Sequence, residues 1–79
     1  PEVIVNSDAE PFVRKGRSVM HGFITGGNGS VRVGMPCLVV NQDDELLAHG
    51  IAQGDVRDMM AFRKGIAVKV KDGVGDAGD

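Results

Sequence analysis

The strand-like segments in the middle of this 79-residue chain follow one another too closely to be joined by crossover helices. Residues 17–25 have a strand pattern, and residues 35–53 contain two more strands, joined at the polar triplet 42–44. Short stretches with glycine or proline, GGNGS and RVGMP, separate them. Because a parallel connection needs a dozen or more residues, the chain cannot make parallel crossovers throughout.

A short helix is predicted near the N-terminus. Ser7 precedes Glu10 by the spacing of a capping box, and Asp8 is an alternative cap. Pro11 falls in the first turn, where its missing N–H group costs little. Gly16 is expected to follow the last turn in a left-handed conformation. The helix therefore has one or two turns.

A second helix is predicted near the C-terminus. Asp55 precedes it as a cap, and Gly65 is expected to end it. Val56, Met59 and Met60 lie at helical spacing and are expected to share one buried face. The methionines are therefore interpreted as core residues.

Two further strands complete the predicted fold. Residues 2–5 are rich in β-branched side chains, and residues 66–71 alternate between apolar and basic or small side chains. The order is β-α-β-β-β-α-β with five or six short strands, so we predict a mainly β domain with two short helices, a small pseudo-barrel closed by helices at its ends. The domain is expected to span residues 1–74, and the acidic tail 75–79 is expected to be frayed.

The sequence contains the same basic tripeptide twice, Arg14-Lys15-Gly16 and Arg63-Lys64-Gly65. If each ends a helix, its cations lie at the negative end of the helix dipole and need no other explanation. Arg17 follows the first tripeptide, whereas Ile66 follows the second. The dipole does not explain Arg17, and a glycine beside it would let a phosphate approach the backbone.

Few residues in the chain offer catalytic or metal-binding chemistry. The sequence holds one cysteine, Cys37, and two histidines, His21 and His49, without close ligand spacing. The stretch GGNGSVRVG lacks the Gly-Lys-Ser/Thr ending of a nucleotide-binding loop. We therefore predict no catalytic residues, no metal and no cofactor. Cys37 lies in a hydrophobic segment and no apolar run is long enough for a membrane span, so we expect a buried thiol in a cytoplasmic protein.

Three segments, taken in order, resemble the PUA domain, the module named after pseudouridine synthases and archaeosine transglycosylases. They are PFVRKGRSVM, CLVVNQDDELLAHGIA and MMAFRKGIAVKVKDGV. They resemble the first helix with its glycine loop and second strand, the central hairpin, and the closing helix and strand of that family. Among its members, the chain resembles most the C-terminal PUA domain of archaeal tRNA-guanine transglycosylase-type enzymes.

The resemblance implies that structured RNA, commonly a tRNA acceptor stem or end, binds to the glycine loop, the first helix, the second strand and the last strand. The residues implicated in this way are Arg14, Lys15, Gly16, Arg17, Met20, His21, Lys69 and Lys71. Three phenylalanines and no tryptophan or tyrosine leave little for base stacking, so shape and phosphate contacts are expected to dominate.

The implied partners are RNA and the catalytic domain of a longer parent chain that modifies tRNA. This chain would then be a non-catalytic accessory domain. The alternative is a protein-interaction or ribosome-docking domain of a translation-associated protein, in which the first basic tripeptide only ends a helix. RNA binding that depends on Arg17, Lys69 and Lys71 would separate the two interpretations.

Overall fold

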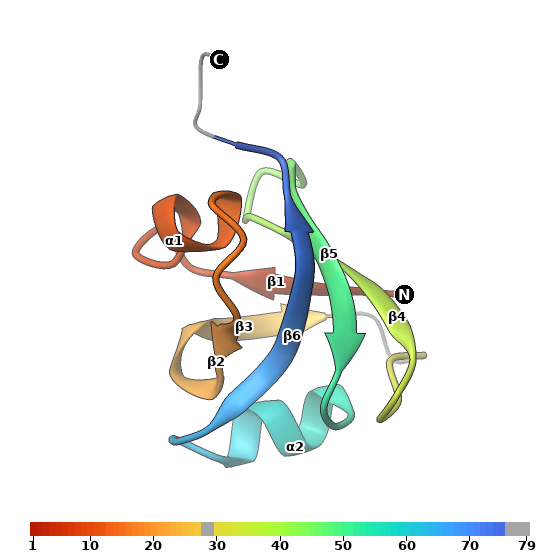
Figure 1. Ribbon diagram of the computed structural model, residues 1–79. Coiled ribbons are helices and arrows are strands. Elements are labelled where there is room, and N and C mark those ends of the chain that lie inside the picture. Colours follow the sequence, from red (N-terminus) through yellow and green to blue (C-terminus); the bar gives the residue numbers. More distant parts are fainter. Residues whose placement is uncertain (28–29, 76–79) are drawn as a thin grey trace.

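The computed structural model describes residues 1–27 and 30–75, which form one curled six-stranded sheet with the order β2-β6-β5-β4-β1-β3. The sheet makes a half-barrel, with α1 near one end and α2 near the other (Figure 1). The predicted fold class, mainly β with two short helices, is confirmed. The elements are β1 (Glu2–Val5), α1 (Glu10–Arg14), β2 (Val19–Met20), the 3-10 helix η1 (His21–Phe23), β3 (Ile24–Gly27), β4 (Pro36–Val40), β5 (Leu46–Ala52), α2 (Val56–Ala61) and β6 (Ile66–Gly73).

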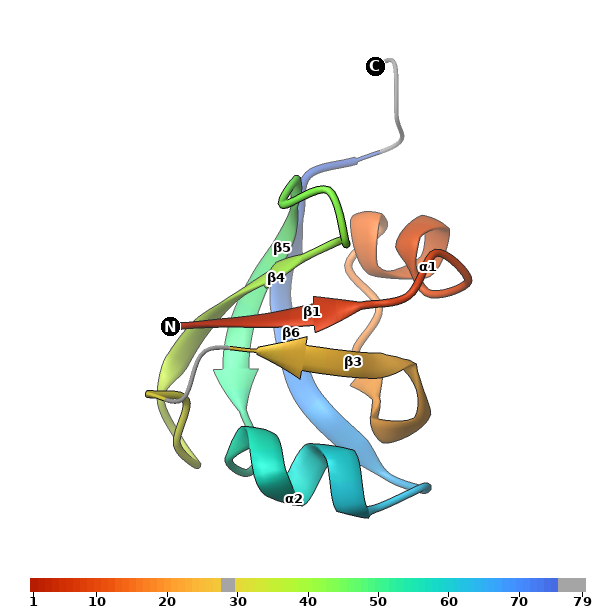
Figure 2. The same ribbon diagram turned by 180° about the vertical axis from the view of Figure 1, so that it is seen from behind.

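Antiparallel pairing dominates the sheet, as the short connections require. β4 pairs with β5, β5 with β6, β6 with β2, and β1 with β3, all antiparallel. β1 and β4 run parallel, and the chain between them is long because it carries α1, β2, η1 and β3. Viewed from behind, β1 and β3 complete the curled wall on the side opposite β6 (Figure 2).

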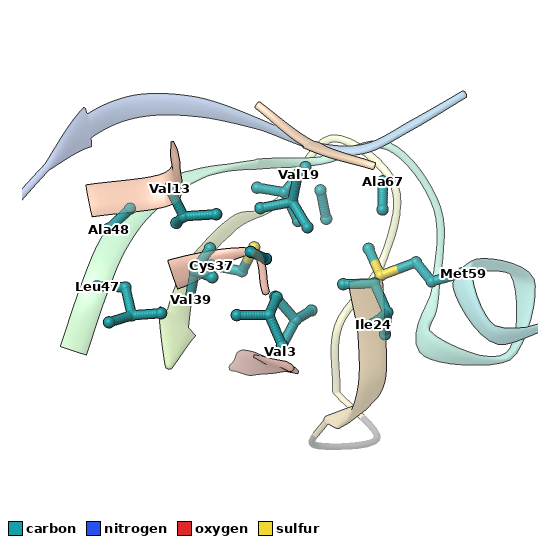
Figure 3. Close-up of a cluster of buried hydrophobic side chains, with 14 of the residues drawn as sticks. Val3, Val13, Val19, Ile24, Cys37, Val39, Leu47, Ala48, Met59 and Ala67 are labelled. Carbon is teal, nitrogen blue, oxygen red and sulfur yellow. The ribbon is translucent and has the colours of Figure 1, made fainter. Parts of the chain in front are cut away.

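Small aliphatic side chains fill the interior of the half-barrel. Both helices and all six strands contribute side chains to one cluster (Figure 3). Valine is the commonest of them, as expected where short strands converge in a small space. Cys37 is one of the cluster, 3% exposed and unpaired, and burial raises the pKa of its thiol. The interpretation of Cys37 as a small buried hydrophobe is confirmed.

The single strand predicted for residues 17–25 is wrong. The segment forms β2, the 3-10 helix η1 and β3, and β2 and β3 lie at opposite ends of the strand order. The chain turns at η1, where the His21 N–H donates to the Gly65 carbonyl at 3.0 Å instead of continuing a β ladder. Residues 26–27, predicted as loop, extend β3, whereas residues 28–29 of that loop lie outside the described residues.

The start of α1 also differs from the prediction. Ala9 is the N-cap, and no side chain caps it, so neither Ser7 nor Asp8 has the predicted role. Asn6 is the residue that supports the entry into the helix, because its Oδ1 accepts from the Ala9 N–H at 3.2 Å. Pro11 lies in the first turn as predicted.

α2 is shorter than predicted. It begins after Asp55, whose Oδ1 accepts from the Asp58 N–H at 2.7 Å, so the predicted cap is confirmed. It ends at Ala61, with Phe62 extended, and its last turn holds no basic residue. Gly65 is therefore not the residue that ends this helix, and the dipole explanation for the second basic tripeptide is wrong.

The apolar face predicted for α2 holds only in part. Met59 is fully buried, but Met60 is 53% exposed. A six-residue helix turns fewer than two times, so only one line of side chains reaches the sheet. Val56 and Met59, three residues apart, occupy that line.

The alternation predicted for β6 fails at its start. Ala67 and Val68 are both buried, whereas Ile66 is 39% exposed. Val19 pairs with Val68 and Met20 with Ile66, which leaves Ala67 as the extra residue of a β-bulge. A bulge shifts the side-chain register by one, and the two-residue period therefore breaks there.

Candidate nucleic-acid interface

α1 ends in a Schellman motif, which shapes the glycine loop. Gly16 has φ of +94°. The Gly16 N–H donates to the Val13 carbonyl at 2.9 Å, and the Arg17 N–H donates to the Phe12 carbonyl at 3.1 Å. These are the two bonds of the motif, so the predicted left-handed residue after the helix is confirmed.

Replacing Gly16 by alanine should lower the free energy of unfolding by about 1 kcal/mol. A Cβ at this position would meet nothing within 4 Å, so the cost comes from the positive φ and not from a clash. Thermal unfolding should therefore show a fall in Tm of about 4–8 °C. Gly16→Asn should lose less, since asparagine tolerates the left-handed region better. Equal melting of wild type and both variants would contradict this account.

The end of β6 packs directly on the glycine loop. The Gly75 N–H donates to the Arg14 carbonyl at 2.8 Å. A Cβ at Gly73 would lie 2.7 Å from the Gly16 nitrogen and clash with the Arg14 carbonyl. The glycine loop and the last strand are therefore held in a fixed relation, although almost 60 residues separate them.

Arg14 is occupied by ion pairs. Its guanidinium lies 3.5 Å from Glu10 and 3.3 Å from Glu45, and its side chain is 12% exposed. The second pair joins α1 to the tip of the β4–β5 hairpin. Arg14 therefore has a structural task within the domain, in addition to its place beside the glycine loop.

Asn41 organises that hairpin tip, a role that the sequence reasoning missed. It is 5% exposed, and its Oδ1 accepts from the N–H groups of Asp43 and Glu45, each at 2.9 Å. Its amide donates to Glu10 at 3.2 Å and more weakly to Glu45 at 3.4 Å. The signal was present, because an asparagine two residues before an aspartate at a turn is typical of an Asx turn.

A surface hollow of about 510 Å³ lies between the glycine loop and β2. It is lined by Arg17, Ser18 and Met20 together with Phe12 and Phe23. Met20 is 42% exposed and Phe12 54% exposed. The lining of the hollow therefore combines the cation of Arg17 and the hydroxyl of Ser18 with apolar side chains. The sequence reasoning missed both phenylalanines: Phe12 is exposed, and Phe23 is partly buried against the core.

A second hollow, of about 430 Å³, adjoins the first because Ser18 lines both. Its other lining residues come from β5 and β6: Ile51, Gln53, Lys69, Val70 and Lys71. Lys71 is the extra residue of a β-bulge, since His49 pairs with Asp72 and Gly50 with Val70. The structure therefore brings Arg17 and Met20 onto one surface with Lys69 and Lys71. We call these two hollows the Ser18 surface.

His21 lies at the far end of β2, away from the glycine loop. Its ring is partly buried and meets the edge of Phe62, with 5.7 Å between centroids and 67° between planes. Its Nδ1 is buried and has no hydrogen-bond partner within residues 1–27 and 30–75. His21 is therefore tied to the turn before β6 and does not line either hollow.

The cations of the Ser18 surface are available to a ligand. Both ion pairs found among the described residues belong to Arg14. Arg17, Lys69 and Lys71 are exposed, and so is Lys15 in the adjoining glycine loop. In the described part of the chain, no group of three or more His, Cys, Asp or Glu side chains could hold a metal ion, and no helix is long and apolar enough to cross a membrane.

The six-stranded half-barrel, with the left-handed Gly16 beside the end of β6, places this chain among the small pseudo-barrel domains. The chain belongs to the PUA domain family, a family of RNA-binding modules, which matches residues 1–74. It is 43% identical over 72 residues to the tRNA-guanine(15) transglycosylase of Thermococcus onnurineus (strain NA1), covering 91% of this chain and 12% of that protein. The predicted resemblance to these archaeal enzymes is confirmed, and the chain spans about an eighth of their length.

Solved structures share the fold at lower identity. A conserved PUA domain protein from Thermoplasma acidophilum has a TM-score of 0.85 at 28% identity, covering 96% of this chain and 50% of that one. A chain of an H/ACA RNP bound to a substrate RNA has a TM-score of 0.89 at 26% identity, covering 96% of this chain and 24% of that one. PUA domains thus accompany other domains in RNA-modifying proteins.

Proposed function

We propose that this chain binds a structured RNA, a tRNA acceptor stem, through the Ser18 surface and the glycine loop. The observation that carries the proposal is that Arg17 lines one hollow, Lys69 and Lys71 line the other, and the two hollows meet at Ser18. The two segments are about 50 residues apart in the sequence. Cations on both sides of a shallow hollow suit a phosphate backbone. The 43% identity to a tRNA-modifying enzyme supports tRNA as the RNA.

The proposed roles differ among the residues. Lys15, Arg17, Lys69 and Lys71 contact phosphates, and Gly16 lets the backbone of the RNA approach the loop. Met20 offers an apolar contact in the first hollow. Arg14 is already paired with Glu10 and Glu45, so we expect it to contribute less than the exposed cations. His21 would contribute from the far end of β2.

Within this proposal, the chain is the non-catalytic accessory domain of a longer enzyme that modifies tRNA in the cytoplasm. The relatives that it matches are about eight times as long, so they have room for a catalytic domain beside it. The buried, unpaired Cys37 is compatible with a reducing compartment. RNA binding by shape and phosphate contacts requires neither metal nor cofactor.

A titration of the isotopically labelled chain with an acceptor-stem hairpin ending in CCA tests the proposal. We expect amide shifts at residues 14–21 and 67–71, and we expect them to weaken at higher salt because phosphate contacts release counterions. The amides of β1 and β4 serve as an internal control. A folded chain without such shifts would contradict the proposal and favour a protein-docking or ribosome-docking domain.

A further inference from the structure

The second basic tripeptide forms a turn with the same glycine geometry as the first. Gly65 has φ of +95°, against +94° for Gly16. The first turn ends a helix, but the second does not, because α2 already ends at Ala61. Arg63 and Lys64 therefore lack the helix-end explanation that accounts for Arg14 and Lys15.

The two turns lie at the two ends of β2. Gly16 comes three residues before β2, and the Gly65 carbonyl accepts from the N–H of His21, the residue directly after it. The segment after α1 and the turn before β6 lie along the same side of the molecule in both views, with β2 between them (Figures 1 and 2). Gly16 and His21 are five positions apart in the chain, so their Cα atoms are at most about 18 Å apart, and the second turn is hydrogen-bonded to His21.

The cations of the second turn have no structural partner. Arg63, Lys64 and Gly65 are all exposed, and neither cation makes an ion pair with any of residues 1–27 and 30–75. Arg14, in contrast, is held by two carboxylates. Two adjacent cations that pair with nothing in the described domain are free to meet an external anion.

The surface between the two turns is apolar. Met20 and Ile66 are cross-strand partners and are 42% and 39% exposed. Phe62, at 58% exposed, packs against His21 beside them. A long nucleic-acid backbone could follow such a strip with cations at each end, and the apolar centre could face sugar rings or bases.

We propose that Arg63-Lys64-Gly65 is a second phosphate-contacting turn, and that the RNA interface runs along β2 from the Gly16 turn to the Gly65 turn. The exposed cations Arg63 and Lys64 supply the phosphate contacts, because a Cβ at Gly65 would already lie 3.6 Å from the His21 ring. His21 positions this turn through its hydrogen bond and its contact with Phe62. The inference rests on the proposed RNA binding and extends it to the far end of β2.

The test compares two double variants of the 79-residue chain in binding the acceptor-stem hairpin at 50 and 200 mM salt. R63Q/K64Q removes the charges of the second turn, and R32Q/R57Q removes two exposed cations elsewhere as a matched control. If Arg63 and Lys64 each contact a phosphate, the affinity of the wild type should fall about tenfold more than that of R63Q/K64Q between 50 and 200 mM salt. R32Q/R57Q should keep the steep wild-type salt dependence. Circular dichroism confirms that each variant is folded.

The outcomes separate this inference from the proposed function. If R63Q/K64Q retains the salt dependence of the wild type while loss of the Ser18-surface charges weakens binding, the second turn is not a contact and only the inference fails. If the wild type does not bind the hairpin, both fail. Amide shifts at residues 63–65 in the wild-type titration give an independent check, and their absence would also overturn the inference.

Discussion

Replacing Gly73 by alanine is expected to lower the free energy of unfolding by about 3 kcal/mol and to weaken RNA binding as well. A Cβ at Gly73 would overlap the Arg14 carbonyl and lie 2.7 Å from the Gly16 nitrogen, and both are backbone atoms that cannot rotate away. Either β6 or the glycine loop must shift, and forced shifts of this kind cost roughly 1–3 kcal/mol or more. Chemical denaturation measures the loss of stability.

The control for Gly73→Ala is Gly26→Ala in β3. A Cβ at Gly26 would have its nearest neighbour at 4.0 Å, the Cδ1 of Ile4, which is ordinary contact. Gly26→Ala should therefore change the stability by less than about 1 kcal/mol. If Gly73→Ala were as stable as Gly26→Ala, the close packing of β6 on the glycine loop would be wrong.

The contact at Gly73 illustrates what the sequence could not predict. The sequence predicts that Gly16 takes a left-handed conformation, because a glycine after a short helix with Arg and Lys in its last turn is a local signal. It does not predict that Gly73 touches this loop. Gly73 lies beyond the strand predicted for residues 66–71, and only the curvature of the sheet brings it to α1.

The errors at the secondary-structure level have the same origin. An alternating pattern predicts a strand at residues 17–25, yet the half-barrel needs β2 and β3 at its two open edges, so the chain turns at Gly22. The bulge at Ala67 exists because β6 pairs with both β2 and β5 while it curves. Local periodicity carries no information about either requirement.

The sequence identifies the cations of the proposed site but not the shape of the surface that holds them. Arg17, Lys69 and Lys71 were identified from the sequence, and the structure brings them together at Ser18. The hollows themselves were not predictable, since Ser18 and Gln53 are ordinary polar residues until the strands are placed side by side. The pairing of Arg14 with Glu45 was equally hidden, because 31 residues separate the two.

The repeated tripeptide shows how a sufficient local explanation can mislead. Both copies satisfy the same rule for a helix end, but only the first follows it. α2 ends early because Phe62 leaves the helix in an extended conformation and packs on His21. The likeness in sequence corresponds to a likeness in the glycine conformation, +94° and +95°, and not to a shared helix end.

Removing the three charges of the Ser18 surface, R17Q/K69Q/K71Q, is expected to weaken binding of the acceptor-stem hairpin by about a hundredfold at 100 mM salt. Each phosphate contact contributes roughly 0.7–0.9 to the slope of log K against log salt, so the slope should become shallower by about 2. The three side chains are exposed and outside the core, so unfolding should change little. Fluorescence anisotropy at several salt concentrations measures both quantities.

The charge-preserving variant R17K/K69R/K71R is the matched control, because it changes the same positions and keeps three cations. If phosphate contacts dominate, this control should retain the wild-type salt slope even where its affinity falls, since the slope counts neutralised phosphates and the affinity also depends on geometry. An equal loss of slope in both variants would indicate that shape at these positions, and not charge, holds the RNA. Undiminished binding by R17Q/K69Q/K71Q would move the interface away from Ser18 altogether.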